Sequence, residues 1–382
     1  MLRVEVKGEM LRWARERAGA SVDDLLPRFP RLQQWESGET RPTLKQLEAY
    51  AKATHAPIGF LFLKEPPQES LPIPDFRTMG GNGVERPSPN LLETIYSCQE
   101  RQDWFREYAR TSRSERLTFV GSATPQSSIV DTAAAMRGRL SFDLSRRREC
   151  TTWTDALRMF IGEADRIGVL VMCSGIVLNN THRRLDPTEF RGFALSDEIA
   201  PLVFINGADS KAAQLFTLAH ELAHLWLGQS ALSDTTITVQ RQNEIETWCN
   251  HVAAEVLVPL EALQRELRAG ESLADSVARL TRLFKVSSLV VLQRLRAAGR
   301  LSWEELRVAY AQEMERIANL SQSSGGGDFY LTAAVRYSRR FTRALVESTL
   351  EGRTLYRDAL RMLGISKTET FHELGRTLAF GG

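Results

Sequence analysis

The sequence contains few of the residues that stabilise secreted proteins and none of the long apolar segments that cross membranes. Its four cysteines, Cys98, Cys150, Cys173 and Cys249, are scattered along 382 residues and form no CxxC pair. This spacing excludes a disulfide framework or a cysteine-built zinc site, and it is typical of reduced thiols. The first residues lack the apolar core of a signal peptide. We therefore expect a soluble, cytoplasmic protein without a membrane partner.

The sequence also lacks an excess of charge of either sign. Lysine and arginine number 49, aspartate and glutamate number 47, and the net charge is +2. This balance argues neither for nor against a nucleic-acid partner for the whole chain, so any basic surface has to be local. The length suggests two or three domains, and an apolar content of 43% is sufficient for ordinary cores.

Histidine is scarce too, and two of the six histidines lie four residues apart in the segment FTLAHELAHLWLG, residues 216–228. On a helix, His220 and His224 lie on one face, so both rings can direct a nitrogen at one ion. Zinc accepts imidazole, and a catalytic zinc site uses three protein ligands and leaves one position open. Glu221, about 100° around the helix from His220, is poorly placed as a ligand but can act as a general base. The segment therefore predicts an HExxH metal site.

The alternative is an amphipathic helix that carries two histidines without a metal. Phe216, Ala219, Ala223 and Trp226 make several sides of this helix apolar. The histidines are therefore expected to be buried. Buried histidines need polar partners, and a metal ion supplies one, which favours the metal site.

A third ligand is expected from a second helix, in the segment NEIETWCNHVAAEVLVP at 243–259. Glu246 lies on the same helical face as the small residue Ala253, and small residues let two helices approach closely. Glu246 is therefore predicted to face the two histidines. Glu244 and His251 are the alternatives.

Together the two segments resemble the ImmA/IrrE family of metallopeptidases. In that family the HExxH helix is followed, one loop later, by a helix with a glutamate, then Ala-Asn or a variant, then small residues and a proline. The resemblance implies that His220, His224 and Glu246 bind zinc, with manganese as the alternative, and that Glu221 is the base. Cys249 stands where alanine is more usual.

The resemblance extends to other parts of the chain and implies a substrate. The segments LPIPDFRT at 71–78 and NNTHRRLDPTEFRGFAL at 179–195 are similar to those of members with a regulator-like N-terminal domain. The known activity of the family is proteolysis of helix-turn-helix repressors in stress responses and in the control of mobile elements. The implied partner is therefore a repressor or an antitoxin-like regulator.

Two further features acquire roles from the resemblance. In such peptidases an edge strand beside the metal pairs with the extended substrate, and we expect PLVFIN, residues 201–206, to be that strand. An ordinary core strand is the alternative. His182, His251 and Tyr330 are candidate donors to the oxyanion, and the sequence does not choose among them.

Residues 9–64 are predicted to form a run of short helices. Ser21 precedes VDDLL as an N-cap, Thr43 is a second N-cap, and Gly38 ends a short helix. The stretch WESGETRPTLKQLEAYAKA resembles the Xre-type helix-turn-helix, with its Glu-x-Gly-x-x-x-Pro spacing.

This helix-turn-helix departs from its family at the DNA-reading position. Only RFPRLQQW remains before Glu36, so the recognition helix is predicted to be truncated. Arg31, Gln33 and Gln34 are the candidate nucleic-acid contacts. Residues 1–65 hold 11 basic and 9 acidic side chains. We therefore expect weak DNA binding, with a protein-contact or scaffolding role as the alternative.

The C-terminal end has its own pattern. A Gly/Ser linker precedes a segment, 329–378, with nine basic and five acidic side chains. Its residues 361–374 echo residues 282–295, with a helix, then VS or IS, then a helix. We expect the linker to uncouple this segment, which favours a regulatory or recruiting role. A helix pair that docks on the core is the alternative.

The predicted fold class is α+β and mostly helical: an HExxH zinc-peptidase core with a small mixed sheet, plus helical N- and C-terminal domains. Strands are expected at 168–172, 190–195 and 201–207. The predicted domains are an Xre-like domain at 1–65, a proline- and glycine-rich connector at 66–88, a zinc metallopeptidase domain at 89–265, a helical extension at 266–320, the linker at 321–328 and a basic helical module at 329–382.

Three functions compete on these grounds. The first is a zinc endopeptidase that cleaves a regulatory protein. The second is a DNA-binding transcription regulator whose zinc site is structural or vestigial. The third is a peptidase that stays latent until a signal or a partner opens its cleft. Glu221 separates the first from the second, because a structural metal site needs no base.

Overall fold

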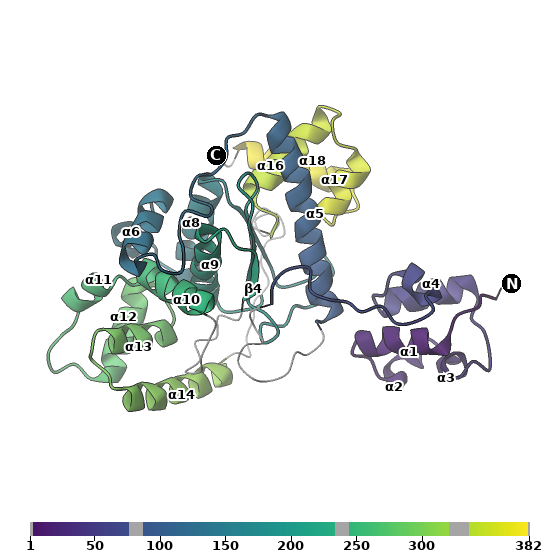
Figure 1. Cartoon of the computed structure of the whole chain (residues 1–382), viewed down its shortest axis with the longest axis horizontal. Helices are drawn as coiled ribbons and strands as arrows, with labels where there is room; N and C mark the ends of the chain where they lie inside the picture. The colour runs from purple at the N-terminus through teal and green to yellow at the C-terminus, as the bar shows by residue number, and fades with distance from the viewer. Residues whose placement is uncertain (1–2, 76–86, 234–243, 321–335, 381–382) are drawn as a thin grey trace. The chain divides into compact units, whose positions relative to one another are not determined.

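A small four-stranded sheet with helices on both faces organises the larger part of the chain (Figure 1). The computed structural model describes residues 3–75, 87–233, 244–320 and 336–380. Its chain forms two units, residues 1–72 with 84–96 and residues 73–83 with 97–382. The fold is α+β and mostly helical, as expected. No helix in the described part of the chain is long and apolar enough to cross a membrane.

The N-terminal unit is a bundle of short helices, two of which begin at the predicted caps Ser21 and Thr43. Ser21 and Asp24 form one capping box, and Thr43 and Gln46 form a second. The buried Tyr50 hydroxyl donates a 2.7 Å hydrogen bond to Leu11 O and ties two helices together. The elements are α1 (Gly8–Arg17), α2 (Val22–Leu25), α3 (Leu32–Glu36), α4 (Leu44–Ala53), the 3-10 helix η1 (Ile58–Phe62) and the start of α5 (Pro89–Thr111).

The larger unit continues with α5 and contains the sheet. The helices that were predicted before and after the strands in the sequence are present. α10 ends just before Pro259, as expected. Its further elements are α6 (Ile129–Leu140), α7 (Leu144–Glu149), α8 (Trp153–Arg166), β1 (Leu170–Ser174), β2 (Gly192–Leu195), β3 (Leu202–Asn206), α9 (Lys211–Trp226), β4 (Ala231–Ser233), α10 (Glu244–Leu257), α11 (Leu260–Arg265), α12 (Leu273–Phe284), α13 (Ser288–Ala297), α14 (Trp303–Leu320), α16 (Arg339–Leu350), α17 (Tyr356–Met362) and α18 (Thr368–Phe380).

The strand order is β1-β3-β2-β4, with β1 parallel to β3 and β2 antiparallel to both of its neighbours. The expectation that residues 201–206 form an edge strand is therefore wrong, because β3 pairs on both sides. The burial of β3 agrees with this central position, because all five β3 residues are buried, which is typical of a strand covered on both faces. The short strand β4 lies next to β2 at the end of the order.

The sheet holds the helix that carries the two histidines. α9 packs on β2, β3 and α8, and α10 packs on α9. Ser210 caps α9 by accepting a hydrogen bond from Ala213 N. Every residue from Gln214 to Trp226 is buried, and the small residues Ala219, Ala223 and Ala253 let the two helices approach closely.

The two helix pairs that echo each other in the sequence are present as α12–α13 and α17–α18. Each turn contains a residue in the left-handed region, Lys285 with φ 52° and Gly364 with φ 59°. The shared positions are mostly core positions: Phe284, Val286, Leu292, Leu295, Leu363, Phe371 and Leu374 are all buried. The echo thus reflects a shared packing pattern.

The C-terminal helices dock on the sheet unit, so the expectation that they are uncoupled from it is wrong. α16 packs on β1, and Phe341 contacts Trp104 of α5 edge-to-face. Asn179 Nδ2 donates hydrogen bonds to Leu363 O and Gly364 O. The apolar face of α16 needs a core to cover it, whatever precedes it in the chain. The linker residues 321–328 lie outside the described residues.

A buried carboxylate fixes the start of α16. Asp165 accepts hydrogen bonds from Ser338 Oγ at 2.7 Å and Arg339 N at 3.1 Å. Burial raises the pKa of Asp165 to about 6, despite these donors. A carboxyl whose pKa is raised by folding contributes most to the stability of the folded state when the pH is below its ordinary pKa near 4. This contribution to stability is lost as the pH rises through 6.

The first prediction compares the wild-type chain with Asp165→Asn. The wild-type free energy of unfolding, relative to that of the variant, should fall by about 1.4 kcal/mol between about pH 5 and pH 8, because the folded state releases a proton there. Urea unfolding at the two pH values measures it. A difference that grows with pH would contradict this assignment.

Candidate metal centre

The two histidines of α9 lie on one face of the helix, as their spacing predicts. Both side chains are fully buried. Their Nε2 atoms are 3.1 Å apart, and their ring centroids are separated by 4.9 Å. The HExxH segment therefore presents two imidazole nitrogens at one point inside the protein.

The first turn of α10 brings Glu246 to the same point. Glu246 Oε2 is 3.2 Å from His220 Nε2, and Oε1 is 3.0 Å from His224 Nε2. One ligand atom from each residue lies within 4.8 Å of the others. Glu244 and His251, the alternatives, have exposed side chains on the same helix.

The charges at this point are coupled. Burial alone would raise the pKa of the Glu246 carboxyl, but the neighbouring His220 and His224 hold it well below its usual range. Among the described residues, no donor makes a hydrogen bond of good geometry to either Glu246 oxygen, although two ring nitrogens lie about 3 Å away. The three side chains converge on a common point, with their nitrogen and oxygen atoms 3.0 to 3.2 Å from one another. Two imidazoles and a carboxylate are a donor set that fits Zn²⁺.

Glu221 lies beside this triad but does not belong to it. Its carboxyl is fully buried, and burial raises its pKa to about 8. β2 approaches α9 here so closely that a Cβ on Gly192 would lie 2.5 Å from Thr217 Cγ2 and 3.3 Å from Glu221 Cγ. A buried carboxyl that can exchange a proton near neutral pH is suited to general base work.

Ser233 is a further polar group at the centre, and sequence analysis missed it. This fully buried residue ends β4, with Oγ 3.2 Å from His224 Nε2 and 3.5 Å from Glu221 Oε2. A single serine in a short segment gives no local signal. Only the pairing of β4 with β2 brings it to the triad.

Of the three candidate oxyanion donors, the two that the structure describes, His182 and His251, do not share the burial of the triad. His182 and His251 have exposed side chains, whereas the triad is buried. Tyr330 lies outside the described residues. The oxyanion donor thus stays unassigned.

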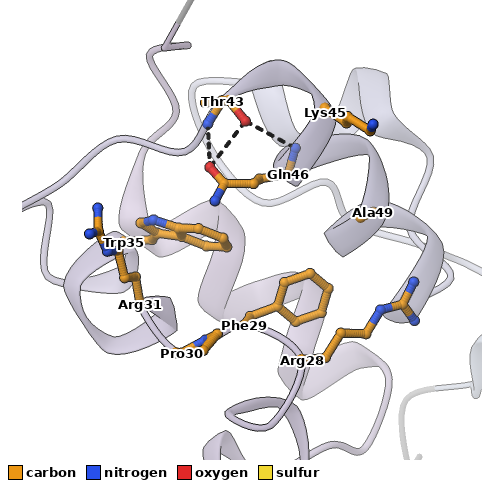
Figure 2. A pocket seen from close by; sticks show the side chains of 9 residues that line it. All are labelled: Arg28, Phe29, Pro30, Arg31, Trp35, Thr43, Lys45, Gln46 and Ala49. Atoms are coloured by element: carbon orange, nitrogen blue, oxygen red, sulfur yellow. Dashed lines mark hydrogen bonds between the residues drawn. The ribbon is translucent and has the colours of Figure 1, made fainter. Parts of the chain in front are cut away.

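The predicted nucleic-acid contacts lie in the N-terminal unit. α3, at the position of the predicted recognition helix, has only five residues. Arg31 is its N-cap residue, and Gln33 and Gln34 are exposed on it. Figure 2 shows a pocket of about 560 Å³ between this helix and α4. Arg31 lines this pocket, but Gln33 and Gln34 do not. The other lining residues are Arg28, Phe29, Pro30, Trp35, Thr43, Lys45, Gln46 and Ala49.

Comparisons with known proteins identify two segments. Residues 164–296, about a third of the chain, match the peptidase family model described as the IrrE N-terminal-like domain. This match spans the triad and supports a metallopeptidase of the ImmA/IrrE kind. Residues 337–377 match a domain of unknown function, DUF8813, and cover most of α16 to α18. No curated protein matches the chain.

The second prediction concerns metal content. Purified protein should hold about one zinc per chain, and His220→Ala, His224→Ala and Glu246→Ala should each lose most of it, because three protein ligands hold the ion. Glu221→Gln should keep the metal. Elemental analysis after dialysis measures it, with the exposed Glu244→Ala as the matched control. Full zinc in Glu246→Ala together with loss in Glu244→Ala would make the ligand assignment wrong.

The third prediction concerns DNA. The full chain should bind DNA weakly and in a salt-sensitive way, because α3, the predicted recognition helix, has only five residues and because the basic side chains of residues 1–65 barely outnumber the acidic ones. Fluorescence anisotropy across a salt series measures it. A footprint at physiological salt that disappears when Gln33 and Gln34 are changed would overturn this expectation.

Proposed function

We propose that this chain is a zinc-dependent endopeptidase that cleaves a regulatory protein, most directly a helix-turn-helix repressor, in a stress-response, mobile-element or defence context. One observation carries the activity: His220, His224 and Glu246 converge on one buried point, and Glu221 stands beside them without being part of the triad. The match of residues 164–296 to a peptidase family supports it. The repressor as substrate comes from the resemblance to the ImmA/IrrE family.

The roles of the residues follow from their positions. His220, His224 and Glu246 would hold the metal. A bound zinc ion supplies Lewis acidity, which lowers the pKa of a water ligand toward neutrality and polarises the scissile carbonyl. Glu221 would accept the proton of the attacking water and pass it to the leaving amine. Manganese is the alternative cofactor.

The second candidate function is a DNA-binding regulator with a structural metal site. Three basic side chains line the pocket of Figure 2, Arg28, Arg31 and Lys45, and they favour some contact with an anionic partner. Glu221 weighs against a purely structural site. A buried carboxyl costs free energy, and Glu221 Oε1 has no hydrogen-bond partner among the described residues. A role as general base would account for a buried carboxyl at this position, whereas a structural metal site would not need one.

The β4 end of the sheet suggests how a substrate is bound, although β4 itself is buried in the described state. An extended peptide can add to a sheet edge, and β4 rather than β3 is the strand beside Glu221. Leu232 N of β4 already donates a 2.9 Å hydrogen bond to Pro74 O. We therefore propose that the described state is a closed one, which supports the third candidate function, a latent peptidase.

The fourth prediction tests the reaction. Zinc-loaded protein incubated with a helix-turn-helix repressor from the same genome, one encoded beside it being the first choice, should cut that repressor. Glu221→Gln should lower the rate by at least about a hundredfold, because the general base is lost. Mass spectrometry of the products measures it, and the retained zinc of the variant is the control. Equal cleavage by the variant would exclude Glu221 as the base. Intact repressor together with salt-resistant DNA binding would favour the second candidate.

A further inference from the structure

The hydroxyl of Ser233 occupies a special position at the metal centre. Its Oγ is 3.2 Å from His224 Nε2, a metal-binding atom, and 3.5 Å from Glu221 Oε2, the proposed base. The attacking water of a zinc peptidase has to contact both the metal and the base. Ser233 therefore places a protein oxygen beside one of the expected metal-binding atoms and beside the proposed base.

The distance from Ser233 Oγ to His224 Nε2 matches the distances within the ligand set. The ligand atoms of His220, His224 and Glu246 are 3.0 to 3.2 Å apart, and Ser233 Oγ keeps the same separation from His224 Nε2. Ligand atoms of a tetrahedral zinc ion, each about 2.0 Å from the metal, lie about 3.3 Å from one another. Toward His224, the hydroxyl thus has the spacing expected of a further ligand.

The backbone holds Ser233 in this place from both sides. In the register of β4 with β2, Ser233 pairs with Gly192, the glycine packed against Glu221. On the other side of β4, Leu232 N donates to Pro74 O, and the neighbouring Ile73 is buried. The hydroxyl cannot withdraw far unless β4 shifts or the side chain rotates.

We propose that Ser233 is a fourth, displaceable protein ligand, which occupies the position of the reactive water and keeps the centre in a resting state. The proposal rests on the metal site of the proposed function. A neutral hydroxyl is a weaker zinc ligand than a thiolate or an imidazole, so water or a substrate carbonyl can replace it. Movement of β4 would then activate the enzyme.

The first test replaces the hydroxyl with a stronger ligand in the full-length, cobalt-loaded protein. Ser233→Cys should acquire a thiolate-to-cobalt charge-transfer band in the near ultraviolet that the wild type lacks, because a coordinating thiol is deprotonated at the metal. Ser230→Cys is the matched control, since Ser230 Oγ is three residues earlier and accepts a hydrogen bond from Ser196 N. A metal-loaded Ser233→Cys protein without the band overturns the proposal.

The second test removes the hydroxyl and remains available if Ser233→Cys does not fold. Ser233→Ala should bind acetohydroxamate, a small metal-directed probe, about tenfold more tightly, because no protein ligand has to be displaced. The visible cobalt spectrum reports the titration, and Ser230→Ala serves as the control. Unchanged affinity in Ser233→Ala overturns the proposal.

These readouts are independent of peptide cleavage. A charge-transfer band together with an intact repressor would support the role of Ser233 and contradict the proposed substrate. Cleavage by the wild type without the band would support the proposed function and contradict the role of Ser233.

Discussion

The structure depends on one costly arrangement, a carboxylate and two imidazoles buried at a single point between α9 and α10. Glu246 cannot be buried as an anion without a compensating positive charge, and its oxygens lack well-formed hydrogen bonds among the described residues. A divalent cation would offset this cost and turn the convergence into a favourable interaction. The small residues between the two helices and the cap at Ser210 serve to keep the three groups together.

The rest of the larger unit determines how that point can be reached. β2 covers α9 at Gly192, β4 places Ser233 beside His224 and Glu221, and Pro74 contacts the far side of β4. The C-terminal helices support the sheet from β1, where Asp165 fixes the start of α16. The same packing that builds the site also closes it, which supports a peptidase restrained until β4 moves.

Sequence patterns predicted the features that depend on residues close together in the chain, and they did not predict the features that depend on distant segments. His220, Glu221 and His224 lie on one helix, and Glu246 is singled out by helical periodicity and by small neighbours, so local patterns predict their arrangement. The caps at Ser21 and Thr43 are local as well. The central position of β3, the docking of α16 and the approach of Ser233 depend on pairing between distant segments. No periodicity reports such pairing, so these features were mispredicted or missed.

The central claim is that His220, His224 and Glu246 hold one zinc ion. X-ray absorption at the zinc edge of the full-length protein tests it directly, because the scattering reports the type and distance of each ligand. We predict two imidazole nitrogens at about 2.0 Å and oxygen atoms for the remaining ligands. A sulfur ligand at about 2.3 Å, which Cys249 beside the site would supply, or a spectrum without imidazole scattering, would contradict the account.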